Sequence, residues 1–355
     1  MNSLAGVYRA QGRYAEAELL YKRSLAIREK ALGPDHPDVG TSLSNLAGVY
    51  RSLNRYGEAE PLYKRSLAIR EKTLGPEHAD VGTTLNNLGG LYQNQGRYRE
   101  AEPLYKRALA IREKALGPDH PDVGWSLSSL AGLYRARARY GEAEPLYARA
   151  LSIHDKALGP DHPDVGKSLN NMALLHVSQG RYADAEPLYK RSLAIREKAL
   201  GPDHPDAASP LNNLAWLYQV QGRFSEAEPL YKRALAIREK AFGLDHADIG
   251  TALGNLADLY RAQGRYSEAE PLYKRSLSPM RHGATSDGLL VALLPMMSFR
   301  AAANATCWPP SIHHARICNG TEHLLSCRHT RLIGYCQSVS MACSMDDHQE
   351  QSTCA

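Results

Sequence analysis

A strict 42-residue period constrains the fold of this chain more than any other feature. The tripeptide Gly12-Arg13-Tyr14 returns as Gly96-Arg97-Tyr98 and Gly264-Arg265-Tyr266, and related tripeptides occupy every register between them. The spacing continues without insertion or deletion from residue 1 to about residue 278. A fixed period of this length predicts a linear array of stacked units, in which each unit contacts only its neighbours.

The first half of each repeat predicts an amphipathic helix. In residues 35–76, Asp35 is a good N-cap residue, and Pro37 is tolerated in a first helical turn. Apolar residues then recur at steps of three and four, which is typical of a helix with one buried face. The helix should end near Asn54, because the aligned residue is Gly in five other repeats and Ala138 in one. Gly or Asn at this point predicts a left-handed residue that closes the helix.

The second half of each repeat predicts another helix, from about Tyr56 to the Gly75-Pro76 pair. Pro61 and its equivalents fall inside that helix, and the sequence leaves open whether they bend it or delay its start. Glu60 and Lys64 have the favourable i,i+4 order. Nineteen of the twenty tyrosines fall into three columns with the same 42-residue period, and we interpret all three as repeat core.

Composition narrows the classes of function. The net charge of +5 is mild and dispersed, so a nucleic-acid partner is not predicted. The chain shows no signal peptide and no apolar run of about 20 residues, so neither export nor membrane insertion is predicted, and the expected location is cytoplasmic. All six cysteines lie in residues 279–355, where the repeat stops. We expect this segment to be an irregular, disordered tail containing Cys and His, without a zinc site.

The repeated motifs resemble a known family. The strings Leu-x-Asn-Leu-Ala-x-x-Tyr, Gly-Arg-Tyr-x-Glu-Ala-Glu and Leu-Tyr-x-Arg-Ala/Ser-Leu resemble the tetratricopeptide repeat. The 42-residue length and the string Leu-Gly-Pro-Asp-His-Pro-Asp-Val are similar to the kinesin light chain subtype. The resemblance implies an all-α, right-handed α-solenoid of about seven helix-turn-helix repeats over residues 1–278. The expected pairs are at about 1–32, 33–74, 75–116, 117–158, 159–200, 201–242 and 243–278.

The resemblance also implies a ligand site. In this family the first helices line a concave groove, and a groove asparagine can hold a peptide backbone because its amide both donates and accepts hydrogen bonds. The matching residues here are Asn45, Asn87, Asn171, Asn213 and Asn255, with Ser129 as the departure. The same asparagines could instead satisfy local backbone groups or face water.

Other first-helix positions differ between repeats that are otherwise near copies. Divergence on one face indicates either specificity for a ligand or drift on a solvated surface. Trp125 and Trp216 are the candidate anchors, since buried aromatic side chains dominate peptide affinity. Arg51, Arg135, Lys167 and Arg261 would favour an acidic peptide.

Enzymatic chemistry is not predicted. The repeated histidines, such as His36, lie one repeat apart and cannot share a metal ion, so we interpret them as turn and cap residues. The sequence contains no nucleophile–base arrangement and no phosphate-binding glycine loop, and we expect no cofactor.

The leading hypothesis is therefore an adaptor that binds extended peptide segments of other proteins. The alternatives are a structural array that self-associates end to end and a sensor array of a signalling protein. Association with kinesin heavy chain is not expected, because no heptad coiled coil is present.

Overall fold

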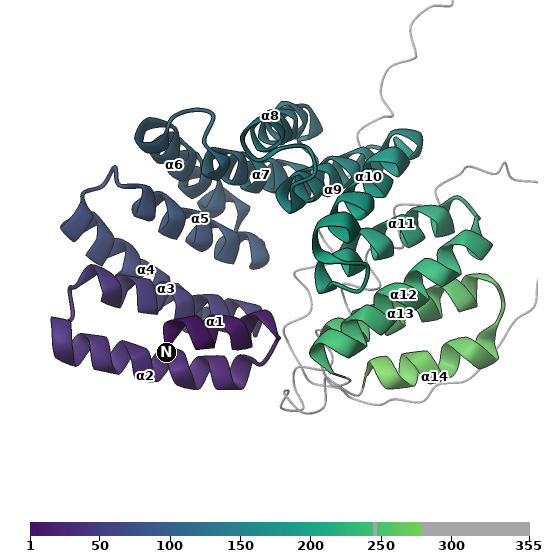
Figure 1. Cartoon of the computed structure of the whole chain (residues 1–355), viewed down its shortest axis with the longest axis horizontal. Coiled ribbons are helices and arrows are strands. Elements are labelled where there is room, and N and C mark those ends of the chain that lie inside the picture. The colour runs from purple at the N-terminus through teal and green to yellow at the C-terminus, as the bar shows by residue number, and fades with distance from the viewer. Residues whose placement is uncertain (244–246, 278–355) are drawn as a thin grey trace, which may run out of the picture. The chain divides into compact units, whose positions relative to one another are not determined.

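A computed structural model describes residues 1–243 and 247–277, and these residues form fourteen α-helices and no strand (Figure 1). The predicted tail, residues 279–355, lies outside this part of the chain. The first helices of the repeats are α1 (Asn2–Ala10), α3 (Pro37–Ser52), α5 (Ala79–Asn94), α7 (Pro121–Ala136), α9 (Pro163–Ser178), α11 (Ala208–Val220) and α13 (Ala247–Ala262). The second helices are α2 (Tyr14–Leu32), α4 (Tyr56–Leu74), α6 (Tyr98–Leu116), α8 (Tyr140–Leu158), α10 (Tyr182–Leu200), α12 (Phe224–Phe242) and α14 (Tyr266–Ser276).

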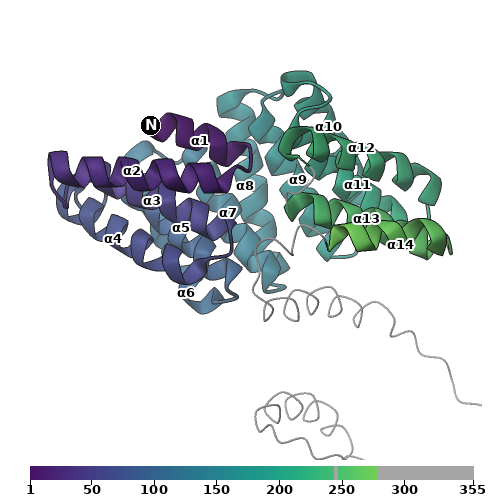
Figure 2. The same ribbon diagram turned by 90° about the horizontal axis from the view of Figure 1, so that it is seen from below.

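Consecutive helices pack against one another along the array. Each first helix contacts the second helix of its own repeat, and each second helix then contacts the first helix of the next repeat (Figures 1 and 2). First helices of adjacent repeats, such as α3 and α5, also touch. The predicted all-α solenoid of helix pairs is therefore confirmed.

The helix starts differ from the prediction in one respect. The N-cap of α3 is His36, and not Asp35: the His36 Nδ1 accepts a hydrogen bond of 3.2 Å from the Asp38 backbone N–H. The same bond recurs at His78, His120, His162 and His204. An unprotonated imidazole nitrogen is an acceptor and can satisfy a free amide of the first turn. The histidines are thus confirmed as cap residues, and the aspartate assignment was wrong.

The turn inside each repeat matches the prediction. Asn54 and Ala138 have φ of 57° and 55°, and the glycines at the aligned positions have φ between 72° and 75°. This left-handed conformation is unfavourable for a residue with a Cβ, and Gly adopts it freely.

We therefore expect Ala138→Gly to raise the free energy of unfolding by about 1 kcal/mol. Gly96→Ala, at the aligned position two helices earlier in the array, should lower it by a similar amount. Urea titration followed by circular dichroism measures both changes. Equal stabilities for wild type and Ala138→Gly would contradict the strain assigned to this turn.

The prolines do not delay the second helices. The helix α4 begins at Tyr56 and continues through Pro61 to Leu74, and the four following second helices keep the same bounds relative to their prolines. One first helix does change at a proline. Pro210 lies in the first turn of α11, and the preceding residues Pro205–Ala207 form a separate 3-10 turn. Pro210 has no N–H to donate to the Asp206 carbonyl oxygen, so the helical hydrogen bond is missing at this turn.

Two of the three tyrosine columns are core. Tyr63 and its equivalents Tyr105, Tyr147, Tyr189 and Tyr231 are almost completely buried, and so are Tyr50 and most of its equivalents. The column that contains Tyr56 is only half-buried, and its last member, Tyr266, is 68% exposed. The residues of this third column lie at the starts of the second helices and, apart from Tyr266, pack against the edge of the core.

An ion-pair network joins successive repeats. Arg97, in the turn after α5, contacts Glu60 of the preceding repeat at 2.7 Å and also pairs with Glu100. Its guanidinium stacks on the Tyr92 ring, whose hydroxyl donates to Glu60. Equivalent arginine–glutamate contacts of 2.6–3.0 Å occur at five other junctions. This network explains why the Gly-Arg-Tyr and Glu-Ala-Glu motifs are repeated so faithfully.

Candidate ligand-binding site

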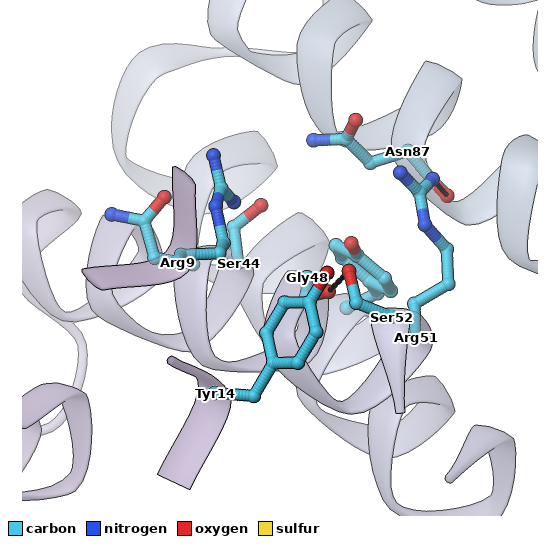
Figure 3. Close-up of a pocket in the computed structure, with 9 residues that line it drawn as sticks. Arg9, Tyr14, Ser44, Gly48, Arg51, Ser52 and Asn87 are labelled. Atoms are coloured by element: carbon cyan, nitrogen blue, oxygen red, sulfur yellow. Dashed lines mark hydrogen bonds between the residues drawn. The ribbon is translucent and has the colours of Figure 1, made fainter. Parts of the chain in front are cut away.

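A polar pocket of 370 Å³ lies on the first-helix side of the early repeats, between α1, α3 and α5 (Figure 3). Its lining comprises Arg9, Tyr14, Ser44, Asn45, Gly48, Arg51, Ser52, Tyr63 and Asn87, and contains no acidic side chain. In Figure 3, Arg9 lies beside Ser44, and the Arg51 guanidinium lies beside Asn87. The pocket therefore combines two guanidinium groups with amides and hydroxyls.

Small residues at two columns keep this pocket open. Ser44 is aligned with Asn170 and Asn212, and Gly48 is aligned with Leu174 and Trp216. In the later repeats, a side-chain amide bridges adjacent first helices: Asn213 donates to Asn170 at 2.9 Å, and Asn255 donates to Asn212 at 2.8 Å. A serine at position 44 is too short for such a bridge to Asn87, and a glycine at position 48 leaves room for the Arg9 guanidinium to lie against α3.

The pocket arginines differ from the turn arginines in their partners. Arg9 and Arg51 form no ion pair within residues 1–243 and 247–277, whereas Arg97 pairs with two glutamates. Arg51 makes only a long contact of 3.5 Å with the Asn87 carbonyl oxygen. Burial raises the pKa of Tyr63, and the charges of Arg51 and Arg9 oppose that rise. Both guanidiniums therefore act on the same hydroxyl, and their positive charge is available to a ligand.

A second set of arginines is buried close to the first helices. Arg70, Arg112 and Arg196 are 6–7% exposed, and burial lowers the pKa of each despite nearby aspartates. Arg70 donates to the Asp80 carbonyl oxygen and to the hydroxyls of Thr84 and Thr41. Because these partners are neutral oxygens, the cations add to the positive potential near the first helices.

The predicted site residues fall into separate groups. Asn45, Arg51 and Asn87 meet in the pocket, and Asn171 is half-buried on α9. The Asn213 and Asn255 amides are already bonded to neighbouring asparagines.

The predicted aromatic anchors have neighbours of their own. Trp125 lies 5.1 Å from the His154 ring, and the Lys167 ammonium lies 5.1 Å from the Trp125 ring while it also pairs with Asp164. Trp216 is 39% exposed, and its ring lies edge-on to the Tyr182 ring with the two centroids 6.5 Å apart. Trp216 therefore keeps more free surface than the partly enclosed Trp125.

The two remaining predicted arginines are partly engaged. Arg261 pairs with Asp258 at 3.2 Å and also donates to the Tyr273 hydroxyl. Arg135 donates to Ser178 at 3.4 Å, and its buried Nε has no hydrogen-bond partner. Neither lines the pocket that Arg51 lines.

Four residues of the pocket lining were not predicted from the sequence: Arg9, Tyr14, Tyr63 and Ser44. Arg9 could have been found, because it lies one period before Arg51 and occupies the same column. Ser44 could not, since its effect depends on how far a longer side chain would reach across to the next helix. Tyr63 was recognised only as core, yet its hydroxyl contributes to the lining.

Metal clusters and membrane-spanning helices are both absent from the part of the chain that the structure describes. Within residues 1–243 and 247–277, no cluster of three or more His, Cys, Asp or Glu side chains could hold a metal ion. None of the helices described above is both long and apolar enough to cross a membrane.

The stacked helix pairs and their repeated motifs define a helical-repeat scaffold, and comparison with known proteins gives its family. The model of the tetratricopeptide repeat matches overlapping segments that together span residues 1–278. The chain belongs to the tetratricopeptide repeat family. These repeats are generally non-catalytic scaffolds for protein interaction. No curated protein matches the sequence.

Several solved structures are similar to this chain, and two of them have TM-scores of 0.50 and 0.55. BtubC (BKLC) from P. vanneervenii is 23% identical with a TM-score of 0.50, and the match covers 76% of this chain and 98% of that one. The apo form of RapI is 16% identical with a TM-score of 0.55, covering 79% and 96%. A putative kinesin light chain from Podosopora anserina with nearly identical repeats is 31% identical with a TM-score of 0.47, covering 58% and 97%.

Proposed function

We propose that this protein is an adaptor that binds an extended, acidic peptide segment of another protein along its early first helices, α1 to α7. The observation that carries the proposal is the pocket between α1, α3 and α5. There, Asn45 and Asn87 lie together with Arg9 and Arg51, and no carboxylate within residues 1–243 and 247–277 pairs with either arginine.

The later first helices have fewer free side-chain amides than the early ones, which favours the early first helices as the peptide site. The Asn86 Oδ1 and the Ser128 Oγ are buried and have no hydrogen-bond partner. In the later repeats, the amides of Asn213 and Asn255 already bond to neighbouring asparagines. A buried polar atom without a partner costs about 1–3 kcal/mol, so a peptide backbone that reached these groups would recover part of this cost.

The charge of the proposed ligand follows from the unpaired cations. The pocket arginines have no carboxylate partner in the described chain, and the buried Arg70 and Arg112 are bonded only to neutral oxygens. A carboxylate would gain charge-assisted hydrogen bonds from the pocket arginines, which are stronger than bonds between neutral groups. Acidic peptides should therefore bind faster and more tightly than neutral ones, and added salt should weaken their binding.

The proposal can be tested by selecting peptides from a random 12-residue display library on the immobilised full chain. We expect enrichment of Asp and Glu. The affinity of a selected peptide, measured by fluorescence anisotropy, should fall about tenfold with Asn87→Ala, equivalent to the loss of one or two hydrogen bonds.

Asn94→Ala is the matched control, because Asn94 is exposed at the end of the same helix and does not line the pocket. This variant should bind like wild type. If no peptide is enriched, or if both asparagine variants bind like wild type, the proposed peptide site is wrong.

A further inference from the structure

We propose that the pocket between α1, α3 and α5 receives the phosphate of a phosphorylated side chain on the bound peptide. The inference rests on the proposed function, since the phosphate would be carried by the peptide that the first helices hold. It assigns one ligand class to one pocket, which the general preference for acidic peptides does not do.

The two pocket arginines, Arg9 and Arg51, each lie close to a glycine of the next first helix. A Cβ placed on Gly48 would lie 3.0 Å from the Arg9 Nη1 and 3.6 Å from the Tyr63 hydroxyl. A Cβ placed on Gly90 would lie 2.7 Å from the Arg51 Nη1. Each arginine therefore lies over a glycine of the next first helix, Arg9 on α3 and Arg51 on α5, and both arginines line the pocket. Any larger residue at these glycines would displace them.

The donor set carries the second step. A phosphate monoester bears a charge of about −1.5 to −2 at neutral pH and has three strong acceptor oxygens, whereas a carboxylate has one charge and two oxygens. The lining offers two guanidiniums, the amides of Asn45 and Asn87, and hydroxyls including that of Tyr63. These donors are more than the two oxygens of one carboxylate can use. Guanidiniums bind phosphate through paired N–H donors.

The size and charge of the pocket carry the third step. The volume of 370 Å³ falls in the range of small-ligand sites, so the pocket can hold a whole phosphorylated side chain. A lining without acidic side chains imposes no repulsion on a dianion. An acidic residue in this position would have neutralised one arginine and made the site suitable for a monoanion.

The test compares three degenerate 11-residue peptide libraries that differ only in a central phosphoserine, serine or glutamate. Anisotropy with the full-length chain should give at least tenfold tighter binding of the phosphoserine library than of the serine library, with glutamate between them. The double variant Arg9→Ala/Arg51→Ala should abolish this difference, because it should weaken binding of the phosphoserine library at least tenfold more than binding of the serine library. Arg51→Gln is a milder second variant and should reduce the phosphoserine preference severalfold.

Arg99→Ala is the matched control, since Arg99 is exposed on α6 and does not line the pocket. It should keep the full phosphoserine preference. If the full-length chain bound the phosphoserine library no more tightly than the serine library or the glutamate library, the inference would be overturned. The peptide-binding proposal would remain intact. Binding of none of the libraries would overturn both. Inorganic phosphate that competes as strongly as the phosphoserine library would also overturn the inference, because the site would then be one for free anions.

Discussion

Acidification should unfold the repeat array between about pH 4.5 and pH 2. The ion pairs that join the repeats lower the pKa of four glutamates to about 2: Glu60, Glu102, Glu186 and Glu228. The largest cause is the hydrogen bond from Arg97, Arg223 and Arg265 for three of them, and that from Lys106 for Glu102.

The direction follows from proton uptake. In the unfolded chain these carboxyls have an ordinary pKa of 4.5, so they bind protons as the pH falls below that value. In the folded chain the same carboxyls stay ionised until about pH 2. The stabilisation is therefore present above pH 4.5 and is lost as the pH falls towards 2. Because the side chains are 16–21% exposed, screening should leave on the order of 1 kcal/mol for each glutamate.

Thermal unfolding followed by circular dichroism from pH 7 to pH 2.5 measures this loss. Arg97→Gln removes the arginine that Glu60 contacts and should reduce both the stability at pH 7 and its dependence on pH. A melting temperature that is the same at pH 3 and pH 7 would contradict the role assigned to the network.

Gly124→Ala should destabilise the fold by about 2 kcal/mol, because it overpacks a rigid part of the core. A Cβ on Gly124 would lie 2.5 Å from the His154 Nε2 and 2.9 Å from two ring carbons. The ring is fully buried and fixed, with Nδ1 at 2.7 Å from the Ser168 hydroxyl and Nε2 at 3.0 Å from the Pro121 carbonyl oxygen. It cannot retreat without breaking one of these bonds.

Gly40→Ala is the matched control, since Gly40 occupies the same position in α3 and faces Arg70 in place of histidine. Its added Cβ would meet neighbours only at 3.5 Å, an ordinary contact distance. The helix propensity of alanine should then stabilise this variant by about 0.5–1 kcal/mol. Urea unfolding measures both variants, and equal effects of the two substitutions would contradict the packing described around His154.

The regular part of the fold could be predicted because the same helix-forming sequence pattern recurs in every repeat. The helix-closing role of Asn54 and Ala138 was visible in their alignment with glycines, and their φ values confirm it. The cap was misassigned because Asp35 and His36 are adjacent and aspartate is the commoner cap. The network at Glu60 was hidden because its main partner, Arg97, is 37 residues away, and only the stacking of repeats brings the two together.

The candidate site was predicted less completely, because it depends on how far side chains extend between helices and on where large side chains are missing. Asn45, Asn87 and Arg51 were identified from their columns, and the structure brings them to one pocket. The opening of that pocket depends on Ser44 and Gly48 being small, which matters only once the spacing of α3 and α5 is known. The column pattern also gave Asn213 the same weight as Asn87, although its amide is engaged by Asn170.

Photo-crosslinking of a selected peptide is the measurement that tests the central claim most directly. A benzoylphenylalanine placed at successive positions of the peptide would mark its path on the full chain, and mass spectrometry would locate the modified residues. Crosslinks concentrated on α1, α3, α5 and α7, including residues of the pocket, are the predicted result. Crosslinks confined to the second helices or to α9, α11 and α13 would contradict it.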